Sequence, residues 1–282
     1  MKIIECPRDA MQGLPAFIPT EKKVQYLNQL LKVGFDTIDF GSFVSSKAIP
    51  QLRDTVQVLS QLDVSKSNSK LLAIVANARG AEEASQHEKI TYLGFPLSIS
   101  ETFQQRNTNK SIAQALNTVD EIQRICQRSN QKLVTYISMG FGNPYGDPYD
   151  SGLVEKFADI LATMGITVIS LADTVGVSTV DQIKQLFTAL SKKFPSIELG
   201  VHLHSNPATA VDKIEAAYSS GCQRFDGAIR GYGGCPMAED SLVGNLATEK
   251  IISFLDSKGA APQLNREAFR DALLMADSIF ID

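Results

Sequence analysis

Short runs of apolar and β-branched residues alternate with longer segments of helical spacing along the whole chain. The runs that predict strands are 2–6, 35–40, 71–76, 89–94, 132–139, 167–172, 199–204 and 224–229. A helix or helix-like stretch follows each run, and this alternation is typical of a parallel sheet. Eight such units in about 250 residues predict an α/β protein with the (β/α)8 architecture of a TIM barrel.

Two of the intervening segments show a clear apolar stripe. The stripes are Val24, Leu27, Leu30 and Leu31 within 21–33, and Ile183, Leu186, Phe187 and Leu190 within 179–193. Capping-box pairs, Ser111 with Gln114 and Thr179 with Gln182, predict where two helices begin. These signals support helices between the predicted strands.

The chain shows no internal boundary. No Pro/Ser-rich linker or charge run divides residues 1–282, so we expect a single barrel domain, with the polar stretch 62–70 as a surface loop. An open, doubly wound sheet is the alternative. It would require a glycine-rich turn after an early strand, and the sequence has none there.

Charge and cysteine content narrow the class of protein. A net charge of −4 and a pI near 5.5 argue against a nucleic-acid or anionic-membrane binder. No apolar run reaches the ~18 residues of a membrane span, and the chain enters a strand-like segment at once, so we expect no targeting peptide. The four cysteines lie far apart with no CxxC pair. Reduced thiols and a cytoplasmic protein are the expectation.

A histidine pair is the strongest chemical signal. The chain has three histidines, and His202 and His204 fall one residue apart in a predicted strand. Residues i and i+2 of a strand point to the same face, so both imidazoles converge as two ligands of one metal ion would. A single histidine there would more often be a packed core residue. Two of them favour a site.

Other polar residues stand where the predicted strands end. They are Arg8 and Asp9, Asp39 and Ser42, Asp173 and Thr174, and, after the last strand, Cys235 and Asn245. In a (β/α)8 barrel the active site lies at the carboxyl ends of the strands. An acidic oxygen, two imidazoles and an amide oxygen suit a six-coordinate divalent ion such as Mg²⁺, Mn²⁺ or Co²⁺ better than structural zinc.

Arg8 and Cys235 each have two interpretations. Arg8 would be a surface ion-pair partner or a fixed charge that stabilises an oxyanion or enolate. Cys235 would be a packed thiol or a proton-transfer group in a glycine-flanked loop. The glycines of 231–234 lack the spacing of a phosphate-binding loop, so a flexible lid is the preferred interpretation.

At these positions the chain resembles the 3-hydroxy-3-methylglutaryl-CoA lyase family of barrel metallolyases. The motifs are Pro7-Arg8-Asp9-x2-Gln12, Ser42-Phe-Val-Ser45 with Lys47, Ser170-Leu-Ala-Asp-Thr-Val-Gly176, Val201-His-Leu-His204, Gly231-Tyr-Gly-Gly-Cys-Pro236 and Gly244-Asn-Leu-Ala-Thr-Glu249. The Gly-Gly-Cys-Pro loop is similar to the lyase branch. The related synthases lack this cysteine and usually carry a C-terminal extension.

The resemblance implies a role for each matched residue. It implies that the metal ligands are Asp9, His202, His204 and Asn245, that the catalytic residues are Arg8, Cys235, His202 and Asp173, and that Arg8, Ser42, Gln12 and Asp39 contact substrate. With Mg²⁺ or Mn²⁺ as cofactor, the implied reaction cleaves the acyl-CoA to acetyl-CoA and acetoacetate. This chemistry belongs to leucine degradation and ketone-body formation.

Two positions depart from the family pattern. Asp39 stands where the family usually has Glu, and Ser205-Asn206-Pro207 replaces the acidic or amide residue that normally follows the second histidine. Two further hypotheses are therefore kept: a Claisen-type synthase or aldolase on the same barrel, and an inert scaffold barrel. The expected partners are an acyl-CoA substrate and a second copy of the chain in a homodimer, with no nucleic acid and no membrane.

Overall fold

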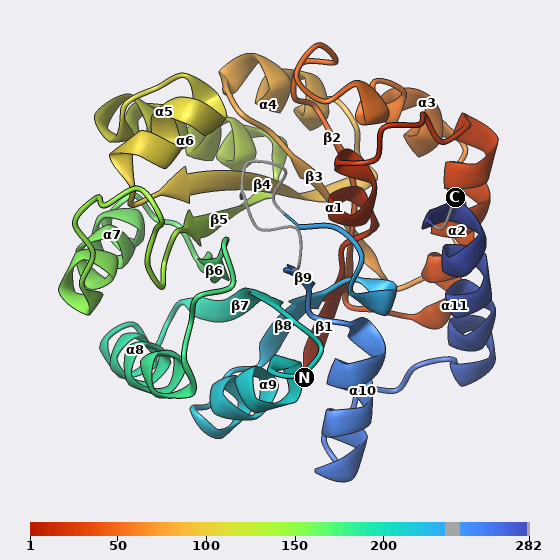
Figure 1. The fold of residues 1–282 in the computed structure, drawn as a ribbon. Coiled ribbons are helices and arrows are strands. Elements are labelled where there is room, and N and C mark those ends of the chain that lie inside the picture. The colour runs from red at the N-terminus through yellow and green to blue at the C-terminus, as the bar shows by residue number, and fades with distance from the viewer. Residues whose placement is uncertain (235–242, 281–282) are drawn as a thin grey trace.

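The computed structural model describes residues 1–234 and 243–280, and these form a closed parallel barrel (Figure 1). Its strands are β1 (Lys2–Glu5), β2 (Thr37–Ser42), β3 (Lys70–Ile74), β4 (Ile90–Ser98), β5 (Lys132–Ser138), β6 (Val168–Asp173), β7 (Glu198–Ser205) and β8 (Arg224–Gly227). Each strand pairs in parallel with the next, and β8 returns to pair with β1. The predicted (β/α)8 barrel is confirmed.

Helices surround the barrel and cover its outer face (Figure 1). They are α1 (Pro7–Gln12), α2 (Thr20–Val33), α3 (Thr55–Ser60), α4 (Ala78–Ser85), α5 (Glu101–Thr108), α6 (Ile112–Ser129), α7 (Ser151–Thr163), α8 (Val180–Lys193), α9 (Ala210–Ser219), α10 (Thr248–Ser257) and α11 (Arg266–Phe280), with 3-10 turns η1 (Pro50–Leu52) and η2 (Ile229–Gly231). Both predicted capping boxes form, at Ser111 and Thr179. Among the described helices, none is long and apolar enough to cross a membrane.

Two strand boundaries differ from the sequence prediction for physical reasons. β4 continues past Gly94 to Ser98, although a glycine followed by Pro96 resembles a strand end. A Cβ at position 94 would lie 2.6 Å from Ile74 Cδ1, so this glycine makes room for side chains packed inside the barrel. β1 ends at Glu5, one residue earlier than predicted, and helix α1 begins at Pro7, whose missing N–H costs nothing in the first turn of a helix.

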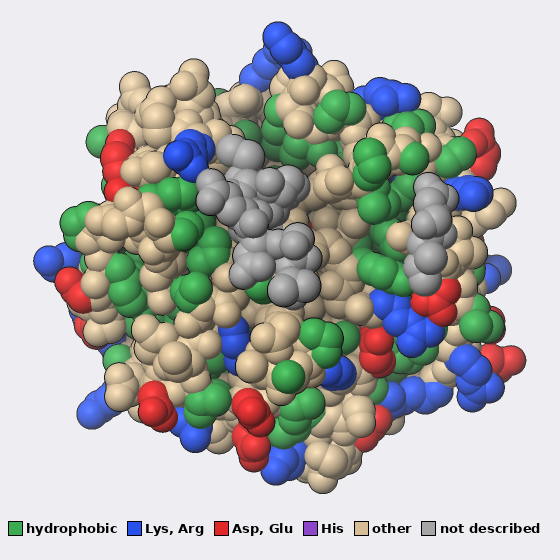
Figure 2. Space-filling view, viewed as in Figure 1, with side chains coloured by type: hydrophobic (Ala, Val, Ile, Leu, Met, Phe, Trp, Pro, Cys, Tyr) green, Lys and Arg blue, Asp and Glu red, His purple; other side chains and the backbone are tan. Residues whose placement is uncertain are grey.

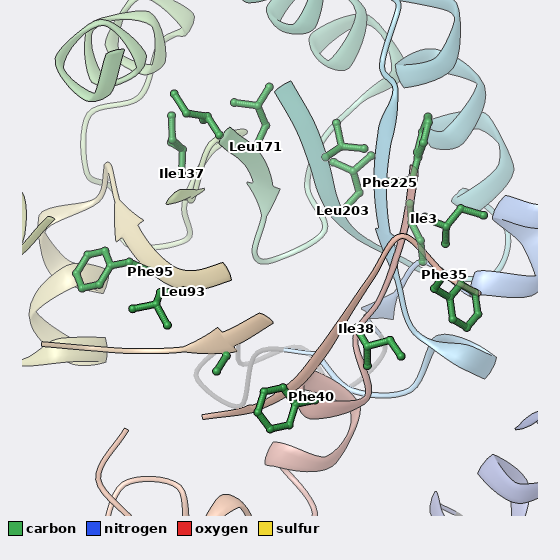
Figure 3. Packing of buried hydrophobic residues seen from close by; sticks show 14 of the residues in the cluster. Ile3, Phe35, Ile38, Phe40, Leu93, Phe95, Ile137, Leu171, Leu203 and Phe225 are labelled. Atoms are coloured by element: carbon green, nitrogen blue, oxygen red, sulfur yellow. The ribbon is translucent and has the colours of Figure 1, made fainter. Parts of the chain in front are cut away.

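The hydrophobic core has two parts. The larger part lies between the strands and the helices, and includes Ile3, Phe40, Phe95 and Phe225 from strands around the barrel (Figure 3). The smaller part belongs to the opposite faces of β3 to β6 and consists of Leu72, Ile74, Tyr92, Val134, Tyr136 and Val168. These alternating faces follow from the two-residue period of a strand.

The barrel interior is asymmetric in polarity. The inward-facing positions of β3 to β6 carry the smaller apolar cluster, whereas the inward-facing positions of β7 and β8 carry His202, His204, Arg224 and Asp226. All four of these side chains are buried or nearly so. One half of the barrel interior is therefore apolar and the other half is charged. Buried charges of this kind are unfavourable unless they are paired or bind a metal.

A short strand, β9 (Gly244–Asn245), joins the barrel at its mouth. It pairs antiparallel with β7, so that Asn245 lies opposite His204 and Gly244 opposite Ser205. Two residues carry no periodic signal, so the sequence did not predict this strand. The pairing fixes the position of Asn245 relative to the histidine pair.

Glu5 ties β1 to the opposite end of the chain. Its fully buried carboxyl accepts hydrogen bonds from the Ile229 N–H at 2.9 Å and the Thr248 hydroxyl at 2.5 Å. Burial raises the pKa of Glu5 to about 8, against the lowering effect of these two bonds. The folded state therefore holds a proton on Glu5 that the unfolded chain releases at lower pH.

A pH-dependent loss of stability follows. The Glu5 contribution is complete below the unfolded pKa near 4.5 and is lost as pH rises through the folded pKa near 8. Relative to Glu5→Gln, a neutral isostere, the wild type should lose about 3 kcal/mol of unfolding free energy between pH 5.5 and 8.5. Denaturant unfolding at both pH values measures the difference. Parallel pH profiles for the two proteins would contradict it.

Candidate active site

Three predicted metal ligands converge at the mouth of the barrel. Asp9 comes from α1, and His202 and His204 come from the same face of β7. One ligand atom from each lies within 4.8 Å of the other two, which is close enough for a single ion to touch all three. The same-face prediction for the histidine pair is confirmed by the 5.3 Å separation of their ring centroids.

His204 is held with one nitrogen free to bind. Its Nδ1 lies 2.9 Å from the Thr174 carbonyl oxygen, which accepts the Nδ1–H. Its Nε2 is buried and has no hydrogen-bond partner among the described residues. Burial, together with the neighbouring His202, lowers the pKa of His204 to about 4. The imidazole is therefore neutral at physiological pH, the state required of a metal ligand.

His202 faces a carboxylate on the neighbouring strand. Its Nδ1 lies 3.3 Å from Asp226 Oδ2, and its ring meets Tyr136 edge-on at 5.7 Å. Burial alone would lower the pKa of His202, but the hydrogen bond and the charge of Asp226 outweigh it and raise the pKa. With Nδ1 on Asp226, Nε2 is the nitrogen left for Asp9 and His204.

Asn245 completes the group from β9. Its Nδ2 lies 2.6 Å from Asp9 Oδ2 and 2.9 Å from the Tyr232 carbonyl oxygen. Burial alone would raise the pKa of Asp9. The positive charge of Arg8 and the electrostatic interaction with the two histidines outweigh burial, and the pKa is lowered. All four residues implied as ligands are thus brought together by the fold.

Arg8 binds two carboxylates at once. Its Nε and Nη2 donate to Asp39 Oδ2 at 3.0 and 2.5 Å, and its Nη1 donates to Asp9 Oδ1 and Gln12 Oε1 at 2.9 Å. Gln12 Nε2 donates in turn to Asp9 Oδ1 at 2.8 Å. Burial raises the pKa of Asp39 to about 6 against the effect of Arg8. The side chain of Asp39, although shorter than Glu, still reaches the guanidinium.

A cavity of about 560 Å³ opens onto this cluster. Arg8, Asp9, Gln12, His202 and His204 form one end. The remaining wall is mainly apolar and includes Val44, Ile49, Ile74, Val75, Pro96, Phe103 and Tyr136, with Arg106 and Asn107 also contributing to the lining. A polar end and an apolar wall suit a ligand with an oxygen-rich head and a longer tail.

The face of the molecule seen in Figure 2 carries charges of both signs around its edge. Lys and Arg side chains alternate there with Asp and Glu, and no single sign dominates. This mixture agrees with the small net charge of the chain. It gives no broad basic surface of the kind that nucleic acids require.

Two of the described site residues that the sequence predicted lie outside this group. Ser42 lines a separate cavity of about 280 Å³, and its hydroxyl donates to the Ile74 carbonyl at 3.4 Å. Asp173 ends β6 but is not among the residues that line the larger cavity. Cys235 lies outside the described residues.

Asp173 has structural partners instead. Its carboxylate accepts from the Val177 and Ser178 N–H groups and the Ser178 hydroxyl, and it pairs with Lys213 Nζ at 2.8 Å. Lys213 also donates to the carbonyl oxygens of Gly176 and His204. The pair thus connects the loop after β6 to the backbone of a predicted metal ligand.

A second group of possible ligands lies deeper in the barrel. Cys6 Sγ, His202 and Asp226 also present atoms within 4.8 Å of one another. Burial raises the pKa of the Cys6 thiol well above its usual range, and nearby carboxylates add to the effect. A protonated thiol is a poor ligand, and neither Cys6 nor Asp226 lines the larger cavity. The first group is the better metal site.

Sequence reasoning did not select Asp226, Tyr136 or Arg106. Asp226 could have been found from the sequence. Arg224 and Asp226 are two residues apart in a predicted barrel strand, so their side chains share one face. Charges at such positions point to a buried network. Tyr136 and Arg106 carry no comparable signal, since each becomes part of the cavity only through the packing of β5 and α5.

Comparison with known proteins agrees with the fold and identifies the family. The HMGL-like family model matches residues 2–275. The chain is 35% identical over 253 residues to hydroxymethylglutaryl-CoA lyase YngG of Bacillus subtilis, covering 89% of this chain and 83% of that protein. It is 31% identical over 268 residues to the human cytoplasmic 3-hydroxy-3-methylglutaryl-CoA lyase, covering 94% of this chain and 71% of that protein.

Solved structures are similarly close in fold. The HMG-CoA lyase of Bacillus subtilis superimposes with a TM-score of 0.92 at 32% identity, covering 99% of this chain and 93% of that one. An HMG-CoA lyase from Acinetobacter baumannii, in complex with coenzyme A and 3-methylmalate, gives 0.91 at 29% identity, covering 99% and 90%.

The family match and the named lyase relatives identify the chain as a carbon–carbon lyase, as the resemblance in sequence implied. The match over nearly the whole chain makes the assignment specific: the chain belongs to the HMGL-like family.

The buried pair of Lys213 and Asp173 yields a stability prediction. Lys213→Met leaves the Asp173 carboxylate buried without its counter-charge, and should lower the unfolding free energy by about 3–5 kcal/mol. Adding Asp173→Asn removes that stranded charge, so the double variant should be more stable than the single one. Chemical denaturation of the wild type, the two single variants and the double variant checks the order. A double variant as unstable as the sum of both single variants would show that the two residues act independently.

Proposed function

We propose that this protein is a divalent-metal-dependent lyase that cleaves 3-hydroxy-3-methylglutaryl-CoA, or a close 3-hydroxyacyl-CoA, into acetyl-CoA and acetoacetate. Family membership supports the class of reaction. The observation that carries the metal requirement is the buried Nε2 of His204, which has no hydrogen-bond partner among the described residues and faces Asp9 and His202. A buried acceptor without a partner is costly unless a ligand satisfies it.

The donor set fits Mg²⁺ or Mn²⁺. Asp9 would supply a carboxylate oxygen, and the two histidines would each supply a ring nitrogen. Asn245 donates its Nδ2–H to Asp9, and rotation about its Cβ–Cγ bond would turn the amide oxygen toward the same place instead. When bound, the ion would polarise the substrate hydroxyl and lower its pKa.

Arg8 is the residue we assign to the developing enolate. Its described contacts use the Nε–H, both Nη1–H groups and one Nη2–H, so one of its five N–H groups is left for a ligand. Asp39 and Gln12 hold the guanidinium rigidly at the wall of the cavity. A fixed donor in a partly dry site stabilises a negative oxygen without reorganisation.

The other two residues that the resemblance implies as catalytic are Cys235 and Asp173. The proton-transfer role of Cys235 stays a prediction from the sequence. Asp173 is better explained as a positioning residue, because Lys213 and the 176–178 loop take up its carboxylate. Arg8, Asp9 and Gln12 form the substrate-facing polar end, and the apolar wall suits the methylated acyl chain and the pantetheine arm. Asp39 does not line the cavity and acts through its hydrogen bonds with Arg8.

Several wider expectations also belong to this proposal. A coenzyme A complex of a structural neighbour supports an acyl-CoA substrate. The cytoplasmic location, the homodimer and the place in leucine degradation and ketone-body formation stay predictions.

The decisive experiment is a substrate screen on purified protein. Hydroxyacyl-CoA thioesters are incubated with Mg²⁺ or Mn²⁺ or with EDTA, and acetoacetate and acetyl-CoA are quantified. We expect metal-dependent cleavage of 3-hydroxy-3-methylglutaryl-CoA or a near relative, with EDTA abolishing product and added Mn²⁺ restoring it.

The same screen separates the alternatives. Condensation of acetyl-CoA with a 2-oxo acid, without cleavage, would establish the synthase or aldolase instead. Absence of bound metal by elemental analysis, with no thermal stabilisation by Mn²⁺, would favour the inert barrel. Cleavage that proceeds unchanged in EDTA would remove the metal from the proposal.

Arg8→Lys tests the enolate assignment. Lysine keeps the charge but loses the planar fork that binds Asp39 and the fifth N–H, so kcat should fall by about 10²- to 10³-fold. KM should change much less, because the interaction strengthens in the transition state. Steady-state kinetics with saturating Mn²⁺ measure both. Gln131→Glu, a variant of a buried glutamine remote from the cavity, serves as a control for general perturbation.

A further inference from the structure

A line of alternating charges runs through the barrel from its floor to the active site. Lys2 Nζ lies 2.6 Å from Glu198 Oε2, and Glu198 Oε1 lies 3.3 Å from Arg224 Nη1. Arg224 Nε lies 4.0 Å from Asp226 Oδ1, and Asp226 Oδ2 lies 3.3 Å from His202 Nδ1. The outer pair is partly exposed, whereas Arg224 and Asp226 are fully buried or nearly so.

The fold provides specific space for this line. Gly200 of β7 lies beside Arg224 of β8, and a Cβ at position 200 would come within 2.8 Å of Arg224 Cδ. The aliphatic stem of Arg224 therefore occupies the volume that a side chain at 200 would take. Its Nε and Nη2 have no hydrogen-bond partner among the described residues, so its charge is balanced by the carboxylates of Asp226 and Glu198 alone.

Strand register places Asp226 beside the metal ligand. His202 and Asp226 are direct cross-strand partners in the β7–β8 pair, with inward-facing side chains. An ionised carboxylate only accepts hydrogen bonds, and a neutral imidazole has one N–H. Contact with Asp226 therefore requires the proton on Nδ1 and leaves the Nε2 lone pair facing Asp9 and His204.

We propose that Asp226, with Arg224 as its buried counter-charge, is a positioning residue that fixes the tautomer and ring orientation of His202 for metal binding. The inference rests on the proposed metal site, and it assigns a function to a buried ion pair that takes no part in lining the cavity. Partners of this kind orient ligands and raise their affinity for the ion.

Asp226→Asn is the direct test. An asparagine keeps the shape, but its amide can donate to Nδ1 and so drive the proton to Nε2, where it blocks the metal. We expect the Mn²⁺ dissociation constant to rise by about 10- to 100-fold, measured by electron paramagnetic resonance of free Mn²⁺. Ser170→Ala is the matched control, because its buried hydroxyl also lies in the barrel wall and has no hydrogen-bond partner among the described residues. Its dissociation constant should match that of the wild type.

A second readout needs no metal. The chain has only three histidines, so long-range ¹H–¹⁵N spectra of the metal-free protein resolve the protonated nitrogen of each ring. We expect Nδ1–H at His202 in the wild type and in Ser170→Ala, and a shift of the population to Nε2–H in Asp226→Asn. A purely structural role for Asp226 would leave the tautomer unchanged.

A double-mutant cycle isolates the route of the effect. If Asp226 acts through His202, then Asp226→Asn should change Mn²⁺ affinity less than about twofold in a His202→Gln background. If Asp226→Asn alone does not fold, Asp226→Asn combined with Arg224→Met removes both buried charges, and the same two readouts apply.

The outcomes separate this inference from the proposed function. Wild-type affinity for Mn²⁺ in the folded Asp226 variant, or an unchanged His202 tautomer, overturns the positioning role. A wild type that binds no Mn²⁺ overturns the metal-dependent function, while the tautomer spectra still decide whether Asp226 controls His202.

Discussion

The structure depends on how it balances buried carboxylates at one end of the barrel. Asp9, Asp39 and Asp226 are all nearly or fully inaccessible to water, and they face only two guanidinium groups in the same region, those of Arg8 and Arg224. Three negative charges against two positive ones leave an excess of one. Such an excess would be costly in a dry interior, and a bound cation would offset it, in agreement with the proposed metal site.

This balance explains why Arg8 and Asp39 form so close a pair. Arg8 reaches Asp39 through two nitrogens and Asp9 through a third, so one cation orders two carboxylates. The aspartate at position 39 departs from the glutamate expected by resemblance to the family, yet the contact survives because β2 and α1 pack directly against each other. The departure changes the length of a side chain and leaves the pairing intact.

The strand–helix alternation predicted the barrel well because its eight strands repeat one strong pattern. Strand ends then placed His202, His204, Asp9 and Arg8 at one rim, as the structure confirms. Asn245 was a candidate from its position after the last predicted strand, but the strand that places it opposite His204 was not predicted, since two residues have no period to detect. The role of Asp173 could not be predicted from its position at a strand end. Its carboxylate binds the N–H groups of the loop that follows and pairs with Lys213, which lies 40 residues away in the sequence.

The pairing of β9 with β7 has a consequence for the order of assembly. Asp9 lies near the first residues of the chain, the histidines follow almost two hundred residues later, and Asn245 is held opposite His204 by one of the last pairings to become possible. A ribosome therefore releases most of the barrel before the four-residue cluster can exist. A nascent chain that ends before residue 245 holds at most three of the four residues of this cluster, so the cluster forms only after the rest of the barrel strands have been made.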